Sequence, residues 1–399
     1  ILSANVGNGT GGAVSLSKAG TSTWLVSGTN TYTGTTAVTA GTLQFATPAS
    51  LYNSQSSSWT SANVTVANAA TLAFNVGGAS DFTPAQIGTL YANLNAASGG
   101  FASGAALGIN TDNATADVDI STAFGNTNGG ANTFGLTKSG AGRLLLSGTN
   151  SYTGATSVLG GTLAAGGNSA FGTSAITING GTLDLNSQTI SNTVTLLAGS
   201  LSGGSIAAGN ITAKAGTISA NLTGAGAFSK VTDGTLSAGT VILSGSNSNT
   251  GTISVSAGTL RIAQLSSLYA GTTSSWTAGN ISVSSGATLM VNAGGTGEFA
   301  GADINTLVSG LTAASGGFLS GSLLGVDTSN ATADVVVSSA ISNTGTAGAN
   351  TLGLTKIGSG TLSLSAAATY GGTTTISSGT LTFAGAGNSL GGSIRLNAG

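Results

Sequence analysis

Carboxylates are the side chains of this 399-residue chain that come closest to forming a chemical site. The densest of them are Asp112, Asp117 and Asp119, with Asp327 and Asp334 at related positions further on. Grouped carboxylates can hold Ca²⁺, and a basic residue beside them could abstract a proton. Val336 replaces Asp119 in the second group, however, and neither segment contains Lys or Arg. We therefore expect loop and Asx-turn roles for these aspartates, with no metal site and no catalytic site.

Two pairs of aromatic residues suggest a second kind of chemistry, the binding of sugars. Tyr52 and Trp59 lie seven residues apart in Ser-rich surroundings, and Tyr269 and Trp276 repeat the arrangement. An exposed aromatic face can stack on a sugar ring through apolar contact and C–H···π attraction. Packing within the fold is the favoured alternative, because aromatic side chains are usually buried. These four residues are the candidate interaction residues of the chain.

The composition excludes several classes of function. The absence of His and Cys excludes an imidazole base, a thiol nucleophile, a thiolate zinc site and a disulfide. The net charge is −2 and only 5% of the residues are charged, so there is no basic footprint for nucleic acid. Gly, Ser, Thr and Asn break every apolar run before it reaches the roughly 18 residues of a transmembrane helix. We expect no cofactor, no enzyme activity and no nucleic-acid partner.

A short repeat along the chain predicts the fold. A Gly-Thr-Leu step followed by alternating residues begins at Gly41, Gly161, Gly181, Gly234, Gly258 and Gly379. From Leu163 the apolar position recurs in steps of 17 to 20 residues, at Leu183, Leu201, Ile218 and Leu236. Such steps suit one turn of a parallel β-solenoid, with alternate residues inside and Gly at the corners. The expected fold is all-β, a right-handed parallel β-helix.

A long repeat is superimposed on the short one. Leu51 reappears as Leu268, and the segment 96–101 reappears as 313–318, both offset by 217 positions. We expect one continuous solenoid over residues 1–399, built from a duplicated unit of about 217 residues. The chain starts and stops inside a turn, without the capping turn that a free solenoid needs, so we expect a window of a longer repetitive chain.

Two segments of different rhythm interrupt the solenoid, at about residues 75–131 and 292–349. In the first, Thr83 can cap a helix that begins at Pro84. The apolar residues at helical spacing are Ile87, Leu90, Tyr91 and Leu94 in the first excursion, and Ile304, Leu307, Val308 and Leu311 in the second. We expect each helix to pack this face on the flank of the solenoid. The alternative is a docking element for a neighbouring chain.

The best-formed stretch of the short repeat, residues 136–163, closely resembles the autotransporter-associated β-strand repeat, also called the passenger-associated transport repeat. The residues that carry the resemblance are Lys138, Gly140, Gly142, Leu144, Leu146, Gly148, Asn150, Tyr152, Thr153, Gly154, Thr156, Val158 and Gly161-Thr162-Leu163. Further copies begin at Lys18, Lys230 and Lys356. The copy at Lys230 has a five-residue insertion and Asn249 in place of Tyr, and the copy at Lys356 has Ala368 in place of Asn.

The resemblance implies a parallel β-helix carried outside a bacterial cell as part of a large surface or secreted protein. From it we expect a structural module of a long extracellular fibre, sheath or surface stalk, without catalysis. The alternative is an adhesin region that binds glycan, or a receptor on a host or neighbouring cell, through the excursions. The expected partners are neighbouring copies of the chain or further repeats of the same chain and, for the adhesin, cell-surface glycans.

Overall fold

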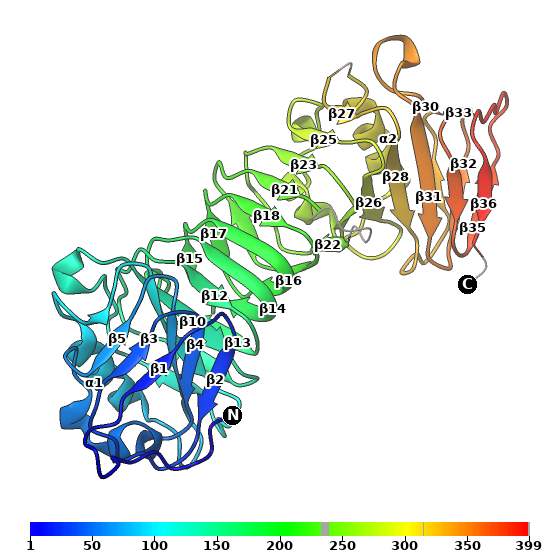
Figure 1. Ribbon diagram of the computed structural model, residues 1–399. Coiled ribbons are helices and arrows are strands. Elements are labelled where there is room, and N and C mark those ends of the chain that lie inside the picture. The colour runs from blue at the N-terminus through cyan, green and yellow to red at the C-terminus, as the bar shows by residue number, and fades with distance from the viewer. Residues whose placement is uncertain (233–238, 314, 398–399) are drawn as a thin grey trace. The chain divides into compact units, whose positions relative to one another are not determined.

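The computed structural model describes residues 1–232, 239–313 and 315–397 of the chain. It divides into two compact units, Ile1–Thr195 with Ser202–Gly204, and Leu196–Leu201 with Ser205–Gly399. Each unit consists of short parallel strands stacked in rows, as the side-by-side arrows of β28 (Ser322–Asp327) and β31 (Leu352–Ile357) illustrate (Figure 1). The predicted all-β parallel β-helix is confirmed in each unit.

The strands of the first unit form three rows. The first row is β1 (Leu16–Lys18), β3 (Thr36–Val38), β5 (Val64–Val66) and β7 (Gly100–Phe101). The second row is β2 (Thr23–Val26), β4 (Thr42–Phe45), β6 (Thr71–Asn75), β8 (Ala105–Asn110), β10 (Phe134–Ser139), β12 (Thr156–Val158) and the start of β14 (Ile176–Asp184). The third row is β9 (Val118–Ile120), β11 (Arg143–Leu146), β13 (Thr162–Ala165) and the end of β14. A short strand, β15, spans Thr189–Ile190.

The second unit repeats this plan. Its first row is β18 (Ile211–Ala213), β21 (Phe228–Lys230), β23 (Ile253–Val255), β25 (Ile281–Val283) and β27 (Gly317–Phe318). Its second row is β16 (Val194–Ser202), β19 (Gly216–Ile218), β22 (Thr240–Leu243), β24 (Thr259–Ile262), β26 (Thr288–Asn292), β28, β31, β34 (Thr374–Ile376) and β36 (Ile394–Leu396). Its third row is β29 (Val335–Val337), β32 (Thr361–Leu364) and β35 (Thr380–Phe383). Two further pairs are β17 (Ser205–Ala207) with β20 (Asn221–Thr223), and β30 (Ile341–Ser342) with β33 (Ala368–Thr369).

The core lies between the rows and is made by alternate residues of each strand. Leu43, Leu72, Leu107 and Leu136 stack in register along the second row of the first unit and are at most 1% exposed. The leucine of the Gly-Thr-Leu step therefore faces inward, as its spacing predicts. In the second unit Ile218 pairs with Leu243. The expected partner Leu236 lies outside the described residues.

The two motif copies of one unit occupy different rows. Lys18 lies in the first row, whereas Lys138 lies in the second, in register with Ile109. The cause is β9, an additional strand after β8 that starts the third row, so the next motif copy begins one row later. In the second unit Lys230 lies in the first row and Lys356 in the second, with β29 as the additional strand. Each excursion thus moves the motif by one row.

The excursions are shorter than the sequence indicated. The range 75–131 contains β7, β8 and β9, and 292–349 contains β27 to β30, all of which pair with strands of neighbouring turns. Leu107 and Ile109 of β8 face the core, a strand pattern that the preceding helix and loops conceal in the sequence. The parts that leave the rows are the helical segment before β7 or β27 and the loop that follows β9 or β30.

Each excursion contains one α-helix, α1 (Pro84–Leu94) or α2 (Gly301–Gly310). Thr83 caps α1, because its Oγ1 accepts the Gln86 N–H at 3.2 Å while Gln86 Oε1 accepts the Thr83 N–H at 2.9 Å. In α2 the Asp303 carboxylate accepts the Ala300 N–H at 2.8 Å. The expected apolar face is buried in both helices, and α1 packs on β7 and β9 while α2 packs on β29.

Short 3₁₀ turns lie at Pro48–Ser50 (η1), Tyr52–Ser54 (η2), Ser56–Ser58 (η3), Asn128–Gly130 (η4), Leu265–Ser267 (η5), Tyr269–Gly271 (η6), Thr273–Ser275 (η7) and Thr346–Gly348 (η8).

Candidate functional site

The four candidate aromatic residues lie in the interior. Tyr52 and Tyr269 are 4% exposed, and Trp59 and Trp276 are 1% exposed. Each indole Nε1 donates to a main-chain carbonyl at 3.2 Å, that of Leu51 for Trp59 and that of Leu268 for Trp276. Sugar stacking needs an exposed ring face, so this geometry favours the packing alternative for all four residues.

The two tyrosines also stabilise an uncommon backbone turn. Tyr52, Asn53 and Ser54 all have positive φ, of 52°, 49° and 63°, and the equivalent Tyr269 and Ala270 have φ of 51° and 53°. Consecutive residues of this kind are disfavoured by about 1–2 kcal/mol each. The single hydrogen of the Tyr52 hydroxyl is shared between the carbonyls of Gly34 at 3.0 Å and Asn63 at 3.1 Å, and that of Tyr269 between the carbonyls of Gly251 and Asn280 at the same distances. These cross-turn bonds oppose the strain.

The clustered aspartates of the first unit are each bound to a different group. Asp112 Oδ1 accepts the Ala141 N–H at 2.8 Å, and Asp119 accepts the Ser147 hydroxyl at 2.5 Å. Asp117 forms an ion pair with Arg143 at 2.9 Å. Sequence reasoning missed Arg143 because it lies on β11, in the next turn of the third row. In the part of the chain that the structure describes, no three His, Cys, Asp or Glu side chains form a metal-binding group.

The second unit holds a charged version of a polar network that is neutral in the first. Asp327 is 1% exposed and forms an ion pair with Arg261, whose Nε donates to Asn292 Oδ1 at 2.7 Å. At the equivalent positions of the first unit, Gln44 donates to Asn75 Oδ1 at 2.6 Å and Asn110 replaces the aspartate. The charges of Arg261 and Asp327 therefore balance each other inside the fold, so Asp327 is not positioned as an open metal ligand.

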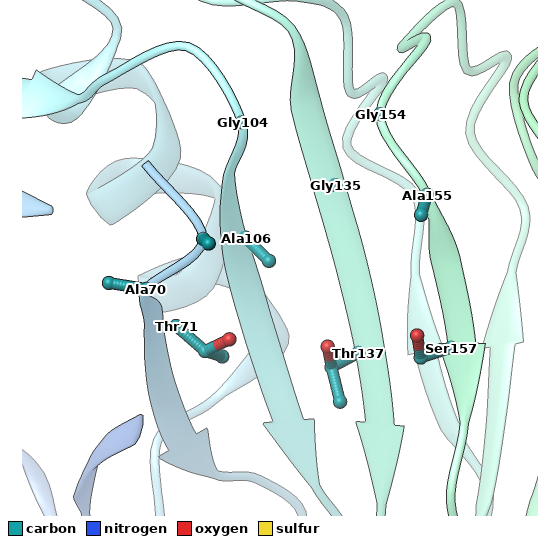
Figure 2. Close-up of a pocket in the computed structure, with 10 residues that line it drawn as sticks. Ala70, Thr71, Gly104, Ala106, Gly135, Thr137, Gly154, Ala155 and Ser157 are labelled. Atoms are coloured by element: carbon teal, nitrogen blue, oxygen red, sulfur yellow. The ribbon is translucent and has the colours of Figure 1, made fainter. Parts of the chain in front are cut away.

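A shallow groove crosses the outer face of the second row in both units. In the first unit it measures about 210 Å³, and short residues of β8, β10 and β12 line it, as Figure 2 shows. The second unit has a groove of about 260 Å³ at the equivalent positions. Glycines create both grooves, but backbone crowding requires them: a Cβ on Gly154 would lie 2.4 Å from the Phe134 carbonyl oxygen. Turn packing thus accounts for the grooves.

The lysine of the repeat is the most consistently placed polar residue. Lys18, Lys138, Lys230 and Lys356 are all 0% exposed. The Lys138 ammonium donates to the carbonyls of Ser139, Gly140 and Gly160, at 2.8, 2.7 and 3.1 Å. The first two carbonyls belong to its own corner, and the third lies 22 residues further on, in the next turn. We call this arrangement of carbonyls the lysine socket.

The other three copies repeat the lysine socket. The acceptors of Lys18 are the carbonyls of Ala19, Gly20 and Ala40, at 2.9, 2.6 and 3.1 Å. The acceptors of Lys356 are those of Ile357, Gly358 and Ser378, at 3.0, 2.7 and 3.1 Å. Lys230 donates to Val231 and Ala257, both at 3.0 Å. Ala257 is 27 residues away instead of 22, so the cross-turn bond survives the five-residue insertion.

Burial lowers the pKa of three socket lysines, Lys138, Lys230 and Lys356. It lowers the pKa of Lys138 to about 8, and the charge of Asp112 acts in the opposite direction. Burial also lowers the pKa of Lys230, and that of Lys356, where Asp327 opposes the shift. Charge-assisted bonds to carbonyl oxygens compensate the ammonium for part of the hydration that it loses.

The asparagine of the repeat joins three successive turns. Asn150 Oδ1 accepts the Phe124 N–H of the preceding turn at 2.7 Å, and its Nδ2 donates to the Ala170 carbonyl of the following turn at 2.6 Å. Asn30 and Asn247 make the same pair of bonds at 2.7 to 2.9 Å. In the copy that has Ala368 instead, β30 and β33 pair at this corner.

The tyrosine of the repeat forms a buried pair with a threonine four residues later. Its hydroxyl lies 2.7 to 2.8 Å from the threonine Oγ1 in the pairs Tyr32–Thr36, Tyr152–Thr156 and Tyr370–Thr374. The copy with Asn249 has Ile253 at the threonine position, so the pair is lost as a whole. Among the described residues, the lysine, asparagine and tyrosine of the repeat therefore hold neighbouring turns of the fold together and do not form an open site.

The comparison with protein families agrees with this motif. Four segments match the model described as passenger-associated transport repeat, residues 16–45, 136–165, 236–262 and 354–382. The resemblance seen in the sequence is confirmed, and three of these segments contain the socket lysine. No curated protein and no solved structure matches the chain.

Such repeats are associated with the passenger domains of autotransporters, which are surface-exposed or secreted. The chain therefore carries four copies of a repeat that is associated with surface-exposed or secreted proteins. Within the described ranges, no helix has both the length and the apolar character needed to cross a bilayer.

Proposed function

We propose that this chain is a structural module of a long extracellular bacterial fibre, sheath or surface stalk, without catalysis. The inward direction of the repeat's polar side chains carries the proposal. Lys138, Asn150 and Tyr152 are at most 4% exposed, and their polar atoms bind the fold itself. A motif that served a ligand would present such groups to solvent, whereas here they join successive turns.

The charged groups support the same proposal. Asp112, Asp117 and Asp119 bind three different protein groups, so they do not form a matched acid and base. The socket lysines are fully buried, which keeps their amines away from any substrate. The aspartates and the socket lysines thus bind other groups of the fold.

We propose further turns of the same kind as partners, from the same chain or from a neighbouring copy. Strand pairing and side chains such as Asn150, which binds main-chain groups of the turns before and after it, join successive turns of the chain. A further turn of the same sequence type, from this chain or from another copy, would make the same contacts.

The test separates a scaffold from an adhesin. Beads coated with the purified chain are offered to bacterial and host cells and to a glycan array, and the free chain is imaged by electron microscopy. A scaffold predicts elongated assemblies and no saturable binding of cells or glycans. Saturable binding together with an absence of assemblies would overturn the proposal.

The excursions are the surface through which an adhesin would act, and a matched pair of variants tests them. Thr89 and Asn93 are exposed on α1, and Thr65 is exposed on β5. If excursions make contacts, Thr89→Arg with Asn93→Arg abolishes cell binding while Thr65→Arg retains it. Substituting the four aromatic residues would not discriminate, because their removal would damage the interior.

A further inference from the structure

The lysine sockets have a property that goes beyond a scaffold role. Within the described part of the chain, the ammonium groups of Lys18, Lys138 and Lys356 have no carboxylate partner at ion-pair distance. Main-chain carbonyls of two successive turns satisfy them instead. A backbone carbonyl cannot be neutralised or modified under mild conditions, so the lysine amine is the one variable member of each socket.

Three donors are needed to fill a complete socket. A lysine ammonium has three N–H donors, which match the three carbonyls around Lys138. An amine that keeps only one donor leaves two of the three buried carbonyls without a partner. The bond to Gly160 is the one that reaches the next turn.

The cross-turn bond is maintained where the chain varies. Lys230 still reaches the next turn although five residues have been inserted between the two partners. The copy at Lys356 keeps its socket although the asparagine of the repeat is absent. Of the lysine, asparagine and tyrosine of the repeat, the lysine is thus the one that all four copies retain.

We propose that each socket lysine is a latch between two turns, and that acylation of its amine before folding keeps that corner open. In the reaction, the neutral amine attacks the carbonyl carbon of an activated ester and an N–C bond forms. The leaving group departs with the bonding electron pair, and the amine proton passes to water. The resulting amide has one N–H, no charge and added bulk, so it cannot fill the socket. Closed latches are protected from the same reagent.

The experiment labels the lysines of the folded chain with N-hydroxysuccinimide acetate and follows each one by mass spectrometry. Lys214 is the internal reference, because it is the one lysine of the chain's five that lies outside the sockets, and it is half-buried. We expect the socket lysines to react at least about 100-fold more slowly than Lys214, because a corner must open first. Equal rates would overturn the proposal.

A second arm acetylates the chain in denaturant and then removes the denaturant. We expect acetylated chains to recover neither the far-ultraviolet strand spectrum nor the protection of main-chain amides near the sockets. A Lys214→Met chain labelled in the same way controls for modification of that residue. Normal refolding of chains acetylated at Lys138 would refute the latch.

If full acetylation only causes aggregation, a pair of lysine variants tests the latch instead. Lys138→Met preserves length and removes the donors, and Lys214→Met is its matched control. We expect faster amide exchange at Leu159, whose N–H donates to the Lys138 carbonyl at 2.9 Å, in the first variant only. The same exchange rate in both variants would contradict the role of the lysine.

Discussion

The asparagine that joins three turns gives the sharpest prediction about stability. Asn150→Ala removes the partner of the Phe124 N–H and of the Ala170 carbonyl, and both residues are 1% exposed. A buried main-chain group without a partner costs about 1–3 kcal/mol, so loss of both partners should lower the free energy of unfolding by about 2–6 kcal/mol. For a unit of this size, at about 2–4 °C per kcal/mol, that corresponds to a melting temperature lower by roughly 4–24 °C.

Urea and thermal unfolding followed by circular dichroism measure this loss. Asn93→Ala is the control, because Asn93 is exposed on α1 and its loss should change stability by less than about 0.5 kcal/mol. Asn150→Asp separates the two bonds, since it keeps the acceptor for Phe124 but loses the donor to Ala170 at neutral pH. Its defect should shrink in acid, where the protonated carboxyl can donate. A loss below about 1 kcal/mol for Asn150→Ala would refute the cross-turn argument.

Three further predictions follow from the burial and strain described above. Burial lowers the pKa of Lys138 to about 8, so its buried charge destabilises the fold below pH 8. The folded chain loses this proton at a lower pH than the unfolded chain does, so stability should rise between pH 8 and the ordinary pKa of lysine. Burial raises the pKa of Tyr152, so stability should fall again above about pH 10, where unfolded tyrosines ionise. Urea midpoints from pH 6 to 11 should therefore pass through a maximum, and Lys138→Met should reduce the rise without removing it, because burial also lowers the pKa of Lys230 and Lys356. Ala270→Gly should stabilise the second unit by about 1 kcal/mol in urea unfolding, because φ at this exposed position is 53°, and a loss of stability would contradict the strain. Asp327→Asn alone should cost about 1–3 kcal/mol by leaving Arg261 unpaired, and adding Arg261→Gln, which copies the first unit, should restore most of it; a double-mutant cycle without coupling would exclude the ion pair as the cause.

The sequence alone determined the features that depend on local pattern. The turn length follows from the spacing of 17 to 20 residues between successive apolar positions of the short repeat. The inward leucines follow from the alternation of side chains along a strand. The cap of α1 and its apolar face follow from residues within one helical turn of each other. The duplication is visible because it preserves residue identity at a fixed offset.

The tertiary structure decided which distant residues meet. Arg143 reaches Asp117 across 26 positions, and Lys138 reaches the Gly160 carbonyl across 22, because stacking places successive turns in contact. The additional strand β9 moves the second motif copy by one row, and this depends on register between strands that no local pattern encodes. The aromatic pairs show the same limit: spacing identified Tyr52 and Trp59, but only the path of the surrounding turns placed both rings in the core.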